Sequence, residues 1–481
     1  MLKHHLKLVL RRRAFWTAAA PSSPFTKYSE NYPSKIDYKV LFSSLPPTQL
    51  TRLPNRLRVA TQLLPTNNTT TVGIWVDPGS YVASLKWKGI HHLLERLIFK
   101  GTGVEEKIEM MGGKLVAQTS FKQISIQATG LLSGEDLFRP LKFLFSVLEN
   151  PKFTDQDIDR ELALLLRERH EAEDKLTKDF ILENLHANSF QNSDVGISIF
   201  GSASNIRTAT KQDIFNYMSE LTTDRMVLVV AGGGICHEEI VGQAKFLFNK
   251  PGREVILKKV IKHGEDIYTK LLRSPKEIFS TGSAIFKGCE VRIDDCNQVL
   301  AQFAIAFNGA CRADYNCIPL MIIKEMLSST LLARIGSNQL AQSMGAFNTN
   351  YKDSGLFGVY ALAMPDCLGD LACLVMLELT KLCSKRSVIS EDELVRARNK
   401  VKATLLRDMD KTSCVAEDIG RQILAHGRRI TYAELFASID AVDVEKIKKV
   451  ASLFINDKDI AIVAAGCLQG LPDYNWLRRR T

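Results

Sequence analysis

The feature that most constrains the fold of this chain is an internal repeat. A segment that begins at Ile206, IRTATKQDIFNYMSELTTDRMVLVVAGG, matches one that begins at Ile439, IDAVDVEKIKKVASLFINDKDIAIVAAG, at an offset of 233 residues. Each copy shows the apolar spacing of an amphipathic helix, then a turn with Asp224 or Asp457, then a buried apolar strand that ends in Ala-Gly. Such a repeat predicts that one structural unit occurs twice.

Two further elements recur in the same order. Met111-Gly112 and Met344-Gly345 share the 233-residue offset, and each pair opens a run with the alternation of a strand. At a slightly shorter offset, TVGIWVDPGS and FAIAFNGA are both apolar strands that end at a glycine turn. A chain of 481 residues also exceeds the roughly 250 to 300 residues at which single cores stop growing. We therefore predict an α+β fold with two tandem homologous domains, each a sheet covered by helices.

The predicted domain boundaries follow the repeat and the turn signals. Residues 46–250 form the predicted N-terminal domain, and residues 288–481 form the predicted C-terminal domain. Between them, residues 251–287 are basic, and the turn signals NKPGRE and RSPKE favour a linker there.

The net charge of +10 is concentrated at the N-terminus. Six lysines and arginines precede the first acidic residue, Glu30, and the rest of the chain carries only +4. An Arg-rich, acid-free start followed by WTAAAPSSP is typical of a mitochondrial transit peptide, which we place at residues 1–35. A disordered basic arm is the alternative. No apolar run reaches the ~18 residues of a membrane span, and no aromatic-basic pattern indicates nucleic-acid binding.

The cysteines show no pattern of a metal site or a disulfide framework. Nine of the ten lie in the second half of the chain, and none forms a C-x-x-C pair. We therefore expect reduced, packed thiols, as in the mitochondrial matrix.

The stretch GIHHLLERLIFKGT contains part of a zinc signature. The inverted metalloprotease motif H-x-x-E-H places two histidines on one helix face, with a glutamate beside the second. His92 and Glu95 match the first histidine and the glutamate, but Arg96 stands where the second histidine is required. A second segment, DIDRELALLLRERHEAED, offers Glu161 and Glu168, seven residues apart on one stripe of a helix, as further carboxylates. The second repeat has no comparable residues, so a metal site would belong to the first half alone.

Motifs in both halves indicate one family. The first half contains PTQLTRLPNRLRVAT, HHLLERLIFKGT, MGGKLVAQTS and LLLRERHEAED, and the second contains AQFAIAFNGA, AEDIGRQILAHGRRITYAELFASIDAVD and LPDYNWLRRRT. These motifs resemble the β-type subunits of mitochondrial processing peptidases, plant sequences in particular. Those subunits are inverted zincins of the pitrilysin family and are related to the core subunits of respiratory complex III. The resemblance spans about residues 46 to 481 and implies the processing-peptidase fold, with mostly antiparallel sheets.

The resemblance also implies roles for single residues. In that family two histidines and a distal glutamate bind zinc, and the glutamate of the motif is the general base; these positions correspond to His92, Arg96, Glu168 and Glu95. A guanidinium has only donors and stays protonated, so Arg96 cannot ligate a cation. We therefore expect no catalytic zinc and expect Arg96 to pair with Glu168 or Glu95. His91 could replace the missing ligand only in a distorted helix, because adjacent helical residues point about 100° apart.

Other departures from the family indicate the same loss. Val116, Ala117 and Gln118 stand where the family carries an asparagine that aligns a peptide, and a glycine run is reduced to Gly336. By contrast, FNTNYKDSGLFGVY is intact, and we interpret it as a strand packed between sheet and helices rather than as a substrate site.

These observations favour a non-catalytic β-type or core-type subunit without a cofactor. Its expected partner is an α-type subunit or a paired core subunit, in the mitochondrial matrix or on the matrix face of the inner membrane as part of complex III. Contact with the membrane would occur only through that complex. The alternative is an active zinc endopeptidase that holds zinc at the family site and cleaves basic presequence peptides. A diverged relative without a stable partner is a third hypothesis.

Overall fold

The computed structural model describes residues 46–65, 67–77, 89–110, 112–120, 123–131, 137–190, 201, 203–219, 221–248, 284–338, 340–351, 354–384 and 386–481. The predicted transit peptide and residues 251–283 of the predicted linker lie outside this part of the chain. Pro46–Thr481 form one compact unit, and the domain boundaries at 250 and 288 stay a prediction. Among the described residues, no helix has both the length and the apolar character that a membrane crossing requires.

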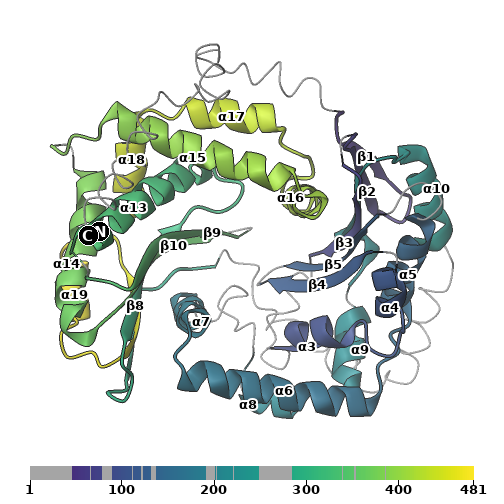
Figure 1. Cartoon of the computed structure of the whole chain (residues 1–481), viewed down its shortest axis with the longest axis horizontal. Coiled ribbons are helices and arrows are strands. Elements are labelled where there is room, and N and C mark those ends of the chain that lie inside the picture. Colours follow the sequence, from purple (N-terminus) through teal and green to yellow (C-terminus); the bar gives the residue numbers. More distant parts are fainter. Residues whose placement is uncertain are drawn as a thin grey trace, which may run out of the picture. The chain divides into compact units, whose positions relative to one another are not determined.

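The first sheet has six strands, whose order in the sheet differs from their order in the sequence. Figure 1 labels β1 to β5 of this sheet. The spatial order is β1-β2-β6-β3-β5-β4. Only β2 and β6 pair in parallel, and the other neighbours are antiparallel. The strands are β1 (Gln49–Arg52), β2 (Arg58–Leu63), β3 (Thr70–Val76), β4 (Lys114–Ser120), β5 (Gln123–Gly130) and β6 (Met226–Gly232).

The second sheet repeats this topology. Its order is β7-β11-β8-β10-β9, with β7 and β11 parallel and the other neighbours antiparallel. The same order results for the first sheet when β1 is set aside, so the sequence repeat corresponds to a structural one. The strands are β7 (Cys289–Asp294), β8 (Ala301–Gly309), β9 (Ser343–Asn350), β10 (Gly355–Ala363) and β11 (Ala461–Gly466). The predicted α+β class with two homologous, mostly antiparallel sheets is confirmed.

Helices connect the strands in both halves. In the first half they are α3 (Ile90–Leu97), α4 (Glu105–Met110), α5 (Phe138–Glu149), α6 (Asp155–Asp174), α7 (Lys178–Ser189), α8 (Ala203–Arg207), α9 (Lys211–Ser219) and α10 (His237–Phe248). In the second half they are α13 (Cys317–Asn338), α14 (Leu368–Cys383), α15 (Glu391–Met409), α16 (Thr412–His426), α17 (Tyr432–Asp440), α18 (Val444–Phe454) and α19 (Tyr474–Arg478). Two 3-10 turns, η5 (Thr223–Arg225) and η6 (Pro365–Cys367), complete the described helical segments.

Each sheet is also covered by a helix from the other half of the chain. Helix α16 packs on β3 and β6 of the first sheet, and its Val415, Ile419 and Ile423 share a buried cluster with Trp75 and Val229. Helix α7 packs on β8 and β11 of the second sheet in the same way. Because both faces of the central strands are covered, β6 and β11 are buried along their whole length and read as continuous apolar runs.

The contact between α16 and the first sheet centres on Trp75, which is fully buried in β3. Its indole Nε1 donates a hydrogen bond to Glu417 Oε2 at 2.5 Å, which satisfies the polar atom of a side chain otherwise surrounded by apolar groups. Gly420 lies one turn farther along α16, against the indole ring. A side chain at Gly420 would have no room, so the glycine sets the distance between this helix and the sheet.

We predict that an alanine at Gly420 destabilises the protein. A β-carbon there would lie 2.5 Å from Cδ2 of the buried Trp75. Alanine stabilises a helix by about 1 kcal/mol relative to glycine. Overlap of its β-carbon with the indole ring in a packed core costs more. We therefore expect Gly420→Ala to lower the free energy of unfolding by about 1–3 kcal/mol, as measured by denaturant unfolding.

Gly242 provides the matched control. It is exposed on α10, and a β-carbon there would have nothing within 4 Å. Gly242→Ala should therefore raise the free energy of unfolding by up to about 1 kcal/mol. Two alanine variants with the same effect would contradict the tight packing of α16 on Trp75.

Candidate metal centre

Helix α3 carries the motif residues outside its buried apolar stripe. The helix begins after Gly89, whose φ of 89° is a left-handed conformation that glycine adopts without strain. Ile90, Leu93, Leu94 and Leu97 recur at helical spacing and are buried in the core of the first half. The intervening positions, which include His92, Glu95 and Arg96, are therefore left partly exposed.

Helix α6 supplies the carboxylates. It begins with a capping box in which Thr154 and Asp157 satisfy each other's backbone N–H groups. Its buried residues, Ile158, Glu161 and Leu165, are spaced by three and four and lie on the side that contacts α3. Glu161 is only 4% exposed. A carboxylate buried to this extent requires a charged partner or several hydrogen-bond donors.

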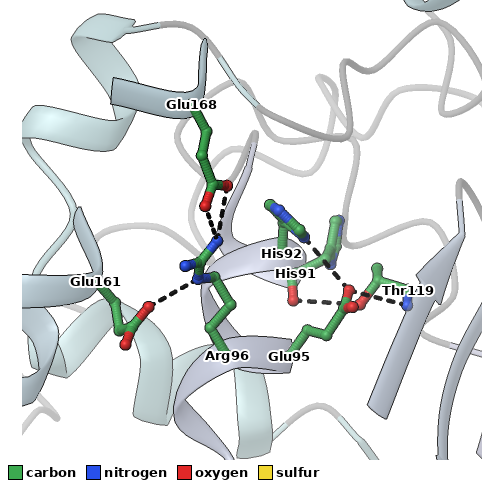
Figure 2. A network of polar contacts seen from close by, with 7 residues as sticks. All are labelled: His91, His92, Glu95, Arg96, Thr119, Glu161 and Glu168. Atoms are coloured by element: carbon green, nitrogen blue, oxygen red, sulfur yellow. Dashed lines mark hydrogen bonds and ion pairs between the residues drawn. The ribbon is translucent and has the colours of Figure 1, made fainter. Parts of the chain in front are cut away.

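Arg96 is that partner, and it bridges two carboxylates of α6 (Figure 2). Its Nε donates to Glu161 Oε2 at 2.7 Å, and its Nη1 lies 2.8 and 2.7 Å from the two oxygens of Glu168. Lys100 adds a contact from Nζ to Glu161 Oε1 at 3.2 Å. Charge-assisted bonds to a planar guanidinium are among the stronger hydrogen bonds in proteins. The side chain of Arg96 thus provides the positive charge that the buried Glu161 needs and pairs with the exposed Glu168 as well.

The other two motif residues form a separate group. The Oε2 of Glu95 lies 3.3 Å from His92 Nδ1 and accepts a hydrogen bond from the backbone N–H of Thr119 at 3.1 Å. The Thr119 hydroxyl donates in turn to the carbonyl of His91 at 3.3 Å. These bonds fasten α3 to β4, as Figure 2 shows. Glu95, the position of the general base in the resemblance, therefore contacts His92 and β4 and has no bond to Arg96.

His91 faces the core. It is 5% exposed, its Nδ1 lies 2.7 Å from the hydroxyl of Tyr217 on α9, and the two rings meet edge to face. Burial lowers the pKa of His91 to about 4, so the imidazole is neutral at physiological pH. The position of His91 against Tyr217 argues against its use as a replacement ligand beside His92.

The residues of this site do not fit a zinc ion. A three-ligand zinc site needs nitrogen, sulfur or carboxylate donors around one point, but here Arg96 directs two of its N–H groups at the oxygens of Glu161 and Glu168. A cation beside Glu168 would meet the guanidinium charge as well as a carboxylate whose oxygens are already bonded. Among the residues that the structure describes, no group of three or more His, Cys, Asp and Glu side chains is placed to hold a metal.

The prediction that Arg96 pairs with Glu168 or Glu95 is confirmed for Glu168. Glu168 pairs with the guanidinium and Glu95 does not. Glu161 is an additional partner; the seven-residue spacing from Glu168 placed both on one stripe but did not show that both reach Arg96. Sequence reasoning missed Lys100 and Thr119. Lys100 follows Arg96 by four residues, a spacing that could have indicated it, whereas the contact with Thr119 depends on the position of β4.

The remaining predicted positions lie outside this network. Val116, Ala117 and Gln118 are in β4, the end strand of the first sheet, and Gly336 lies within α13. In the intact stretch of the second half, Tyr351 is buried with its hydroxyl 2.9 Å from His186 Nδ1, and Tyr360 donates to Gln302 Oε1 at 2.7 Å. Asn348 and Gly355 belong to β9 and β10. The prediction that this stretch forms strands is confirmed, with β10 buried and β9 only partly buried at the end of the sheet.

The network shifts the pKa of its members. Burial raises the pKa of Glu161, but hydrogen bonds from Arg96 and Lys100 outweigh burial and hold the pKa below its ordinary value. Burial lowers the pKa of Arg96, and the bonds with Glu168 and Glu161 outweigh it and raise that pKa. Both shifts favour the charged forms, so the network remains ionised at neutral pH.

We predict that this network stabilises the fold in a pH-dependent way. The pKa of Glu161 is lower in the folded than in the unfolded chain. Its contribution is therefore complete above the ordinary glutamate value of 4.5 and is lost as the pH falls through the folded-state pKa. Arg96→Ala should lower the free energy of unfolding by about 2 kcal/mol at pH 7 and should lose less stability on acidification than the unmodified chain.

Arg167→Ala is the control, because Arg167 forms an exposed pair with Glu171 on the same helix at 3.7 Å. Exposed pairs of this kind contribute only about 0.3–0.5 kcal/mol. Denaturant unfolding between pH 3 and pH 7 measures both variants. Arg96→Ala and Arg167→Ala with the same pH profile would contradict the assigned role of the Glu161 pair.

Comparisons with known proteins identify the family. Residues 58–203 match the insulinase family, peptidase family M16, and residues 208–401 match the peptidase M16 inactive domain. The chain is 42% identical to the probable mitochondrial-processing peptidase subunit beta of Arabidopsis thaliana, over 96% of this chain and 86% of that protein. It is 36% identical to the mitochondrial-processing peptidase subunit beta of Blastocladiella emersonii, over 99% and 98%.

A solved structure shares the fold. A chain from complex III2 of Candida albicans superposes with a TM-score of 0.75 at 20% identity, over 90% of this chain and 99% of that chain. At this identity the likeness concerns the fold alone. Taken with the two family matches and the full-length sequence relatives, it shows that the chain belongs to peptidase family M16, alongside the β subunits of mitochondrial processing peptidases.

Proposed function

We propose that this protein is a non-catalytic β-type subunit that acts through its shape in a mitochondrial assembly. The observation that carries the proposal is the bridge from Arg96 to Glu161 and Glu168. In a zinc peptidase the metal lowers the pKa of a bound water and polarises the scissile carbonyl. Here a side chain of the protein takes the place of the cation, and the guanidinium can hold neither a water nor a carbonyl as a Lewis acid would.

The arrangement of the other motif residues also supports a structural role. A general base must reach the proton that it removes, directly or through one water. Glu95 is bonded to the backbone of β4 and contacts His92, so its hydrogen bonds serve to join α3 to the sheet. Residues that would do chemistry in an active relative therefore join α3 to β4 in this chain.

The names of the relatives support a role within an assembly. Both sequence relatives are named as subunits of a peptidase, and the structural neighbour belongs to a complex III assembly. We infer that this chain pairs with an α-type subunit or with another core-type subunit, and that it works in mitochondria. Which of these partners it takes is the difference between a soluble heterodimer and a component of the respiratory complex.

The second candidate function is an active zinc endopeptidase that cleaves presequence peptides. The names of this chain's sequence relatives favour a peptidase function, and so does the retention of His92, Glu95 and Glu168. This function requires Arg96 to swing away from both carboxylates and leave two protein ligands to hold the metal. This movement of Arg96 would leave Glu161 buried with only Lys100 as its partner. The cost of a poorly compensated buried charge opposes the movement.

We predict that the unmodified chain does not retain stoichiometric zinc after dialysis and that Arg96→His does. The substitution removes the guanidinium charge and adds a nitrogen donor one helical turn from His92, which restores the family ligand set. We expect zinc affinity to rise at least about 100-fold. Elemental analysis and competition with a chromogenic chelator measure it. Arg96→Gln, which removes the charge without adding an imidazole, is the control.

The outcome decides between the two candidates. One zinc per unmodified chain, lost when Glu168 is replaced by glutamine, would overturn the non-catalytic proposal. Equal gains of zinc by Arg96→His and Arg96→Gln would show that charge alone excludes the metal and that the missing ligand does not matter.

We predict further that the unmodified chain, mixed with a separately purified α-type subunit, does not cleave a presequence peptide. Cleavage that a chelator abolishes would instead support the peptidase. Co-purification of the tagged chain then separates the structural roles. Migration with complex III indicates a core-type subunit, and migration with a soluble α-type subunit indicates a heterodimer. The absence of both partners would contradict the role in an assembly.

A further inference from the structure

Two cysteines meet where the first and the last strand of the second sheet end. Strands β7 and β11 are parallel neighbours, and their last ladder pair is Asp294 with Gly466. Cys467 follows β11 directly, and Cys296 lies two residues beyond the end of β7. Parallel pairing therefore brings together two residues that are 171 positions apart in the sequence.

The two sulfur atoms are in contact. The thiol of Cys296 lies 3.1 Å from Sγ of Cys467 and donates to it. A disulfide bond is about 2.05 Å long, so the sulfurs need to approach by only about 1 Å. All ten cysteines of the chain are free thiols in the structure.

Backbone hydrogen bonds hold the two strand ends beside each other. The N–H of Asp295 donates to the carbonyl of Gly466 at 3.1 Å, and the N–H of Leu468 donates to Asp294 Oδ1 at 3.4 Å. Within the turn, the N–H of Asn297 donates to Asp295 Oδ1 at 3.1 Å. These bonds hold the backbone on both sides of each cysteine and so keep the two side chains beside each other.

The pair is also accessible to small molecules in solution. Cys296 is exposed, and Cys467 is half-buried.

We propose that Cys296 and Cys467 form a reversible modification site, in which exchange with a low-molecular-weight disulfide joins them in a disulfide bond. In the first step the thiolate of one cysteine attacks one sulfur of the small disulfide. A bond forms to that cysteine, the original S–S bond breaks, and one small thiolate leaves and takes up the proton that the cysteine released. In the second step the other cysteine loses its proton and attacks the sulfur of the first, and the second small thiol leaves. Two protein thiols are oxidised, and one disulfide is reduced to two thiols.

Either cysteine can act first, because the one that forms the mixed disulfide lies beside the other sulfur. The hydrogen bond to Cys467 and the negative charge of Asp294 raise the pKa of Cys296 to about 11. In a reducing compartment the pair stays reduced, and an exposed pair of this kind becomes oxidised only when the thiol pool does.

The bond would close residues 296–467 into a ring. It would join the edge strand β7 to β11, the last strand of the chain, and so tie the start of the second half to its end. Because the cross-link restricts the conformations of the unfolded chain, oxidation is expected to stabilise the second sheet against opening at this edge. This inference is independent of the metal centre, which lies in the first half.

The test uses the full-length chain in mixtures of oxidised and reduced glutathione. We expect its mass to fall by about 2 Da, the two hydrogen atoms lost, and tryptic mapping should recover the Cys296 and Cys467 peptides as one linked species. The melting temperature should rise by about 5–10 °C and return to its reduced value on addition of a thiol reductant.

Three serine variants make the test specific. Cys296→Ser and Cys467→Ser should each abolish the linked species and the rise in melting temperature, whereas Cys373→Ser, at an exposed cysteine on α14, should preserve both. Melting curves under reducing conditions establish that each variant is folded. Glutathione that remains bound to either cysteine without ring closure, or a different cysteine pair that closes first, would overturn the proposal.

Discussion

A carboxylate buried between two helices must meet a positive charge, and the packing of α3 on α6 depends on how this chain provides it. Glu161 is almost fully shielded from water, and its partners are the side chains of Arg96 and Lys100. Since a buried charge without a partner costs several kcal/mol, the helices can pack closely only with this pair intact. A resident arginine satisfies the requirement without any ligand from solution.

As a consequence, the fold does not depend on the chemistry that related proteins perform with it. The two sheets are held by strand pairing, and α7 and α16 are held on them by buried apolar clusters. A scaffold of this kind can lose its catalytic centre and keep its shape, because function is located in a small set of residues placed on a fold that serves many roles. In this chain the motif residues that remain, His92 and Glu95, contact each other and β4 and so contribute to the same scaffold.

Much of this architecture could be predicted from local patterns, and the part that could not depends on long-range pairing. The repeat at Ile206 and Ile439 indicated two homologous units because amphipathic spacing and apolar runs are properties of the local sequence. The strand order, with β6 and β11 inserted between strands from earlier in each half, follows from pairings that no local pattern encodes. The packing of α7 on the second sheet and of α16 on the first could not be predicted for the same reason. At the site, the ligand positions implied by the family resemblance predicted Glu168 or Glu95 as the partner of Arg96, but not the contact of Glu95 with Thr119. The cysteine pair escaped sequence reasoning entirely, because only the parallel pairing of β7 with β11 brings it together.

We propose that the guanidinium of Arg96 occupies the place of a cation beside Glu161 and Glu168. Diffraction at the zinc absorption edge, from crystals of the chain grown with excess zinc, measures whether a metal binds there. We expect no anomalous peak between His92 and Glu168, with Arg96 Nη1 about 2.7 Å from a Glu168 oxygen. A strong peak within zinc-bonding distance of both side chains, with Arg96 turned away from Glu161 and Glu168, would contradict it.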